Sequence, residues 1–170
     1  MHALAIVAFC VVVAVLYGIA HDQVTARVCI EYFTIGHPPV FGTDDPTLLG
    51  LGWGIIATWW VGAILGLLLA VAARAGRRRR RAVGSLVRPV GQLLLVLGAA
   101  ATVAGSLGWL LASAGGVVLV GRLANEVPPE RHVAFLSAMW AHSASYLFGF
   151  FGGAVSCVRV WRERKASGAE

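Results

Sequence analysis

Charged residues are scarce in this sequence, which excludes most classes of soluble protein. Asp, Glu, Lys and Arg make up 13% of the 170 residues, whereas an average water-soluble domain has about 25%. Apolar residues make up 58% of the chain and form long uncharged runs. These runs exclude a disordered chain, a coiled coil and an ordinary soluble enzyme, so the sequence predicts an integral membrane protein of one domain.

Cysteine pairs and nucleotide-binding motifs are also lacking. The three cysteines, Cys10, Cys29 and Cys157, are widely separated and form no Cys-x-x-Cys pair, which argues against a thiol oxidoreductase. We expect Cys10 and Cys157 to be buried apolar thiols. The sequence has neither a phosphate-binding glycine loop nor a Gly-x-Ser-x-Gly elbow, so it favours neither an ATPase nor a serine hydrolase.

Four apolar runs are long enough to cross a bilayer, because a spanning helix needs roughly 20 mostly apolar residues. The runs cover residues 3–20, 48–73, 90–112 and 132–158. Paired glycines disfavour helix, so the third helix is expected to end at Gly115-Gly116. The sequence thus predicts an all-α, four-helix membrane bundle over residues 1–170, with an ordered outer polar loop at 21–47 and an Arg-rich loop at 74–89.

Positive charge is concentrated in the loop of residues 74–89, which includes the unbroken run from Arg77 to Arg81. The positive-inside rule places this loop in the cytoplasm. If successive segments between the helices lie on alternate sides of the membrane, eleven cationic and two acidic residues lie inside, and three cationic and six acidic residues lie outside. Both termini are then expected in the cytoplasm. The basicity is interpreted as a topology signal that also attracts anionic lipid headgroups, not as a nucleic-acid-binding feature.

The first apolar run has an alternative interpretation as a signal peptide. Gly18-Ile19-Ala20 places small residues where a signal peptidase cuts, but Met1-His2 lacks the Lys or Arg of a secretory n-region. The sequence favours a retained membrane helix. Cleavage would leave the other three helices in the same orientation, so topology does not decide between the two.

Small residues recur at intervals of four in two of the runs: Gly54, Thr58, Gly62 and Gly66 in the second, and Ser145, Gly149 and Gly153 in the fourth. Such ladders let a neighbouring backbone approach closely. We expect both faces to pack against protein and not to line a channel. The packing partner could belong to the same chain or to another subunit of a homo-oligomer, and both alternatives stay open.

Polar residues are concentrated in the outer loop, which reads HDQVTARVCIEYFTIGHPPVFGTDDPT from residue 21. Pro38-Pro39 forces an extended path, and Asp45-Pro46 resembles an N-cap followed by proline at the first helical position. Residues 24–35 are amphipathic and predict a short interfacial helix or an extended re-entrant segment. Arg27 and Glu31 have the spacing of an i,i+4 ion pair.

The string HDQVTARVCIEYFTIGHPP, with the following TLLGLGWG and WWVG, resembles the signature of a family of uncharacterised bacterial integral membrane proteins. The similarity covers roughly residues 17–66, about a third of the chain. The resemblance implies a bacterial protein, which we expect in the inner membrane, and it implies no reaction.

Four of the five histidines map to the outer half of the predicted bundle: His21, His37, His132 and His142. His142 lies ten residues into the fourth run, about 15 Å deep at 1.5 Å per residue. An ionisable side chain at that depth suggests function by default. On a helical wheel His142 shares its face with Tyr146, Gly149 and Gly153, so we expect it to point into the bundle.

Three explanations compete for this outer cluster. In the first it binds a transition metal such as Zn, Fe or Cu, and the candidate ligands are His21, Asp22, Glu31, His37, His132 and His142. In the second, two histidines ligate a haem. In the third, the residues form a structural network of hydrogen bonds and ion pairs. No contiguous motif such as His-Glu-x-x-His decides among them.

Two classes of function follow from these explanations. The leading hypothesis is a metal-dependent membrane protein, which could be an enzyme acting on a lipid-like or small substrate at the outer face. The alternative is a non-catalytic subunit or small transporter whose polar cluster is structural or handles protons. The expected partners are the lipid bilayer and a second copy or another membrane protein, and not nucleic acid.

Overall fold

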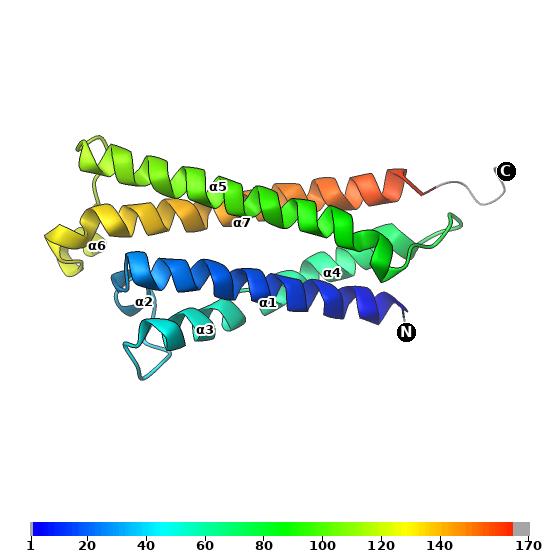
Figure 1. Ribbon diagram of the computed structural model, residues 1–170, viewed down its shortest axis with the longest axis horizontal. Helices are drawn as coiled ribbons and strands as arrows, with labels where there is room; N and C mark the ends of the chain where they lie inside the picture. Colours follow the sequence, from blue (N-terminus) through cyan, green and yellow to red (C-terminus); the bar gives the residue numbers. More distant parts are fainter. Residues whose placement is uncertain (1, 165–170) are drawn as a thin grey trace.

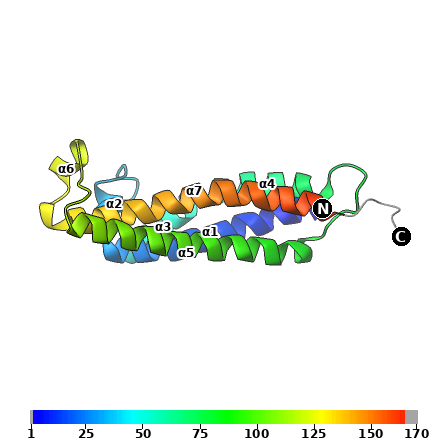
Figure 2. The same ribbon diagram turned by 90° about the horizontal axis from the view of Figure 1, so that it is seen from above.

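Long helices make up most of the protein, whose structure is a computed structural model describing residues 2–164. No strand occurs in that range, which confirms the all-α prediction. Four rods lie side by side along the long axis (Figures 1 and 2). They are α1 (His2–Val28), α3 (Pro46–Ile56) continued by α4 (Trp59–Arg74), α5 (Val87–Ser113) and α7 (His132–Arg162). Short elements join them: α2 (Glu31–Thr34), α6 (Arg122–Glu126), η1 (Val83–Leu86) and η2 (Pro129–Arg131).

Three helical segments are long and apolar enough to cross a membrane: His2–Val28, Pro46–Arg74 and Val83–Ser113. They fit a membrane protein, as the sequence predicts. Helix α7 has 31 residues but is not among them, since His142, Ser143 and Ser145 interrupt its apolar sequence. Four rods are therefore present, but the fourth membrane span stays a prediction.

Helix α1 is longer than the sequence predicts and runs through residues 21–28, which we expected to be loop. Asp22, Thr25 and Ala26 are all buried within this extension. Their burial against the rest of the molecule stabilises helical turns that carry polar residues. The length of the apolar run is therefore shorter than the length of the helix. The predicted segment of residues 24–35 is divided between the end of α1 and the short helix α2.

The second apolar run forms two helices, because α3 ends at Ile56 and α4 begins at Trp59. The Thr58 hydroxyl donates a hydrogen bond to the carbonyl of Gly54. A side chain that competes in this way for a backbone acceptor is a recognised cause of bending in helices. The helix begins at Pro46, two residues before the predicted run. The predicted cap is confirmed, since the Asp45 carboxylate accepts a hydrogen bond of 2.8 Å from the Leu48 amide and proline follows the cap.

The small-residue ladder of the second run packs against α1 of the same chain. A Cβ at Gly54 would lie 2.5 Å from backbone atoms of Ile19, and one at Gly62 would lie 2.7 Å from the carbonyl oxygen of Cys10. The two backbones are therefore in contact, which confirms the predicted packing role. The ladder of α7 is less crowded, because a Cβ at Gly149 would lie 3.5 Å from Leu97.

Two apolar clusters lie toward opposite ends of the bundle. The inner core, near the chain termini, consists of Ile6, Cys10, Leu69, Ala70, Ala72, Ala73, Leu86, Val90 and Val160. The outer core consists of Cys29, Leu119, Val127, Ala134, Phe135, Leu136 and Ala138. Cys10 is buried, as expected, whereas Cys157 is only partly buried and packs against the inner core. Helix α5 ends at Ser113, before Gly115 at φ 72°, so the predicted glycine break is confirmed.

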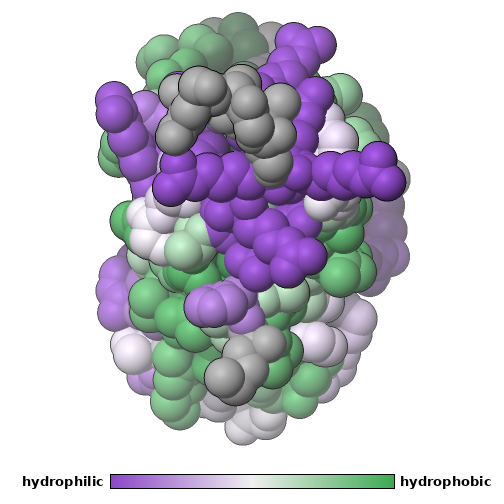
Figure 3. Space-filling model, turned by 90° about the vertical axis from the view of Figure 1, so that its right-hand side faces the viewer, coloured by the Kyte–Doolittle hydropathy of each residue, from purple (hydrophilic) through white to green (hydrophobic). Residues whose placement is uncertain are grey.

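Part of the arginine charge serves to hold together the end of the molecule near the chain termini. The buried Arg164 guanidinium donates hydrogen bonds of 2.8–2.9 Å to the carbonyls of Ala72, Arg78 and Arg79. The Trp161 ring lies 5.2 Å from the same guanidinium. Figure 3 shows hydrophilic side chains gathered over this end of the molecule. These contacts fasten the loop of residues 74–89 to the end of α7.

Candidate functional site

Helices α1 and α7 bring three of the candidate ligands together between the two apolar cores. Ligand atoms of His21, Asp22 and His142 all lie within 4.8 Å of one another. Asp22 is 4% exposed and His142 is 7% exposed, and the His142 Nε2 lies 3.6 Å from the Asp22 Oδ1. The structure thus contains a buried cluster of two imidazoles and one carboxylate, and His142 points inward as predicted.

The hydrogen bonding of this cluster is incomplete at one atom. The Thr25 hydroxyl lies 3.0 Å from the His142 Nε2 and donates to the carbonyl of His21 at 3.2 Å. The His21 Nε2, by contrast, is buried and has no hydrogen-bond partner among the described residues. Leaving a buried polar atom unpaired costs about 1–3 kcal/mol, so this nitrogen needs an explanation.

All three tyrosines of the chain lie against the two imidazoles. The Tyr17 ring stacks on His21 at 5.8 Å between centroids, and the Tyr32 ring stacks on His142 at 4.4 Å. Tyr146 lies 6.4 Å from His142. The Tyr17 hydroxyl is 2.9 Å from the Ser145 hydroxyl, which places that member of the α7 ladder at the site. The rings restrict the orientations of the imidazoles.

The structure places Glu31 outside the cluster, in an ion pair that joins α2 to the start of α7. Its Oε1 accepts a hydrogen bond of 3.0 Å from Arg131, and its Oε2 accepts one of 3.2 Å from the Cys29 thiol. The predicted pair between Arg27 and Glu31 is wrong, because Arg27 donates to Gln23 and Thr47 on its own side of the molecule.

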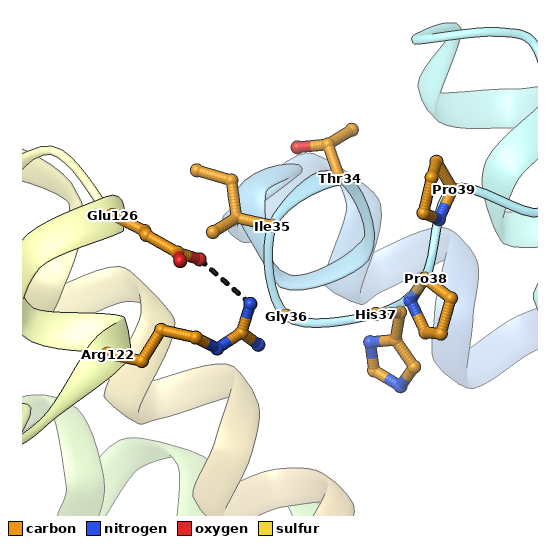
Figure 4. A pocket seen from close by; sticks show the side chains of 8 residues that line it. All are labelled: Thr34, Ile35, Gly36, His37, Pro38, Pro39, Arg122 and Glu126. Atoms are coloured by element: carbon orange, nitrogen blue, oxygen red, sulfur yellow. Dashed lines mark hydrogen bonds and ion pairs between the residues drawn. The ribbon is translucent and has the colours of Figure 1, made fainter.

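His37 and His132 also lie apart from the cluster. The His37 Nδ1 is 2.7 Å from the carbonyl oxygen of Tyr32, and the His132 Nε2 is 2.9 Å from that of Val127. His37 lines an outer cavity of about 510 Å³. In Figure 4 it lies across this cavity from the ion pair of Arg122 and Glu126, which measures 2.9 Å.

The arrangement of His21 and His142 disfavours a haem ligated by both of these residues. The rings of His21 and His142 meet edge to face, with 4.4 Å between their centroids. A haem ligated by both rings would have its macrocycle between them, and rings in direct contact leave no space for it. A single metal ion bound beside the two rings is compatible with this geometry.

The extended helix α1 explains why Tyr17 and Thr25 escaped the sequence analysis. Tyr17, His21 and Thr25 occur at intervals of four, so one helical face carries all three. The spacing is visible in the sequence, but it has meaning only if residues 21–28 are helical. Because those residues were predicted as loop, their alignment with Tyr17 could not be used.

Hydrogen bonding lowers the pKa of Glu31. Burial alone would raise this pKa, but hydrogen bonds from the Glu31 backbone, from Cys29 and from Arg131 outweigh it and hold the pKa below its ordinary value of 4.5. The Cys29 thiol shows the opposite effect, since burial and the adjacent Glu31 raise its pKa to about 12. Glu31 is therefore ionised and Cys29 is neutral at physiological pH.

The variant Glu31→Gln is expected to lower the free energy of unfolding by about 1 kcal/mol. This is the usual contribution of a hydrogen bond to a charged group, reduced for solvent screening because the Arg131 side chain is 35% exposed. A carboxylate with a depressed pKa stabilises the fold above its ordinary pKa, and that contribution is lost as the pH falls through the folded-state pKa. Thermal unfolding of the wild type should therefore show an acid-dependent loss below pH 4.5 that is smaller in the variant.

The control for this change is Glu126→Gln, which removes an exposed i,i+4 pair with Arg122. Pairs of that kind contribute about 0.3–0.5 kcal/mol. Equal effects of the two substitutions would contradict the proposed role of Glu31 in fastening α2 to α7.

Comparison with known proteins gives no relative from which to transfer a function: no protein-family model, curated protein or solved structure matches this chain. The family resemblance of residues 17–66 therefore stays a prediction. The function has to be argued from the chemistry of the site itself.

Proposed function

We propose that this chain is a multi-pass membrane protein that binds one divalent transition metal ion through His21, Asp22 and His142. The observation that carries the proposal is the buried, unpartnered His21 Nε2 beside a second imidazole and a carboxylate. A metal ion would accept the lone pair of this nitrogen and so remove the cost of leaving it unpaired. Two imidazoles and one carboxylate suit Zn²⁺ and non-haem Fe²⁺.

Three protein ligands favour a reactive site over a purely structural one. Structural zinc sites are filled by four protein ligands, whereas catalytic sites keep a position open for water or substrate. A metal bound here would act as a Lewis acid toward that additional ligand. Thr25 and the tyrosine rings would orient the two imidazoles around it. We therefore propose a metal-dependent activity on a lipid-like or small molecule.

A second candidate function is proton handling without a metal, as in a small transporter or a non-catalytic subunit. The observation in its favour is the contact of 3.6 Å between the Asp22 carboxylate and the His142 imidazole. A buried pair of this kind within a helical bundle can carry a proton between its members. In this case the cluster would hold a proton and bind no stoichiometric metal.

The test of the main proposal is metal binding by the wild-type protein. Protein stripped of metal and supplied with Co²⁺ should bind one ion per chain and show ligand-field absorption bands, which d¹⁰ Zn²⁺ cannot give. Binding should weaken in acid, because only neutral imidazole is a ligand. Failure to bind Co²⁺, Zn²⁺ or Fe²⁺ stoichiometrically would contradict the proposal and favour the proton-handling alternative.

The proposed orientation places both termini and the loop of residues 74–89 in the cytoplasm of a bacterial inner membrane. It is supported by the charge asymmetry of the sequence. Gly42 and Gly84 are both exposed and have open space around their Cβ positions. Gly42 lies in the segment before α3 and Gly84 lies in η1. In intact cells, Gly42→Cys should react with an impermeant thiol reagent, and Gly84→Cys should not. The reverse pattern, after subtraction of wild-type labelling, would contradict this orientation.

A further inference from the structure

A cleft of about 360 Å³ lies beside the metal site, between α1, α5 and α7. Its volume is within the range of ligand-binding pockets. The walls include His21 and Thr25 from α1, Gly98 and Thr102 from α5, and Ala138 and Ala141 from α7. One candidate metal ligand, His21, is thus also a wall of the cleft, so a molecule in the cleft lies next to the site.

The polar groups of the walls are largely occupied by the helices themselves. The Thr102 hydroxyl donates to the carbonyl of Gly98 at 2.8 Å, and the Ser137 hydroxyl donates to the carbonyl of Gly105 at 2.9 Å. Small residues elsewhere along the walls offer methyl groups and backbone. A sugar or a nucleotide would lose hydrogen bonds to water here without replacement, whereas a hydrocarbon chain would not.

Access to the site from either end of the bundle is covered by apolar packing. The inner core closes the end near the termini. At the other end the Tyr32 and Phe135 rings lie 5.7 Å apart, and Phe135 belongs to the outer core. Helices α1 and α5 are both within segments able to span a membrane, and Val24, which lines the cleft, is 63% exposed. The cleft therefore faces the lipid phase.

We infer that this cleft binds the hydrocarbon chain of a bilayer lipid and presents it to His21, Asp22 and His142. The inference rests on the proposed function and names its substrate class. Volume, apolar walls and lateral access all agree with a chain that enters between α1 and α5, without passing through water.

Two glycines of α5 provide a matched pair of variants. A Cβ at either Gly91 or Gly98 would meet no atom within 4 Å, so both positions have open space for the start of a larger side chain. Both are partly buried, but only Gly98 lines the cleft. Gly98→Leu should fill the cleft, and Gly91→Leu should leave it open. Equal thermal stability and equal Co²⁺ stoichiometry would show that neither change disturbs the fold or the metal site.

The experiment uses full-length protein in phosphatidylcholine vesicles that contain a phosphatidylcholine analogue with a diazirine in its acyl chain. After illumination, mass spectrometry locates the adducts. Leu95, which is 75% exposed on α5, serves as the reference for ordinary lipid contact. In the wild type and in Gly91→Leu, adducts at Tyr17, Thr25 and Ser106 should be enriched relative to Leu95. In Gly98→Leu the enrichment should fall about tenfold, as expected when a side chain occupies the binding space.

Equal adduct ratios in all three proteins would overturn the inference, even in a protein that binds Co²⁺. The protein could instead bind no metal and still show adducts enriched at the cleft, with that enrichment lost in Gly98→Leu. This result would support the lipid site and contradict only the metal proposal. The two failures are therefore distinguishable in the same set of samples.

Discussion

Replacement of His142 by alanine is expected to abolish stoichiometric metal binding, with a loss of affinity of at least about 100-fold. Changes in the groups that merely orient metal ligands already cost about 10–100-fold, and His142 is one of only three candidate ligand residues in the cluster. Titration of the metal-free variant with Co²⁺ would measure the effect. Asp22→Asn should give a similar loss, and it retains the size of the buried side chain if the alanine variant is unstable.

The matched control is His132→Ala. His132 also lies on α7 and was among the candidates from the sequence, but its Nε2 is 2.9 Å from the Val127 carbonyl and it lies outside the cluster. This variant should keep wild-type Co²⁺ affinity, although it loses a hydrogen bond at the start of α7. Equal losses in His132→Ala and His142→Ala would show that the affinity depends on general stability and would contradict the proposed ligand set.

Substitution of Gly54 by alanine is expected to lower the melting temperature of the detergent-solubilised protein by about 5–10 °C. The added Cβ would lie 2.5 Å from the backbone of Ile19, and backbone cannot move aside as a flexible side chain can. Overpacking of this kind costs about 1–3 kcal/mol, and each kcal/mol corresponds to about 2–4 °C for a chain of this size.

Gly91→Ala is the control for this prediction. It makes the same chemical change within a helix, but its Cβ would meet no atom within 4 Å. Alanine favours helix over glycine by about 1 kcal/mol, so the control should be unchanged or slightly more stable. A Gly54→Ala protein that is as stable as Gly91→Ala would show that α1 and α3 do not pack as closely as described.

Features that depend on local sequence could be predicted. Asp45 caps α3 because its carboxylate reaches an amide three residues away, and Gly115 follows the end of α5 because it adopts a positive φ. The ladder through Gly54 and Gly62 indicates close packing by its spacing alone. The inward direction of His142 followed from the small residues on its helical face.

Features that depend on distant parts of the chain could not be predicted. Glu31 has Arg27 as its obvious partner by spacing, but the fold supplies Arg131, which is 100 residues away in the sequence. The helical state of residues 21–28 depends on the burial of Asp22 and Thr25 against other helices. Without that helix, the sequence offered six candidate ligands and no means of selecting the three that meet.

The distribution of tyrosine gives the protein a built-in spectroscopic reporter. Tyr17, Tyr32 and Tyr146 are the only tyrosines in the chain, and each lies against His21 or His142. The six tryptophans absorb and fluoresce in the same region, but tyrosine vibrational bands are separable from theirs by ultraviolet resonance Raman scattering. Those bands arise from side chains at the site alone, so events at the buried cluster can be followed in the native sequence without a label.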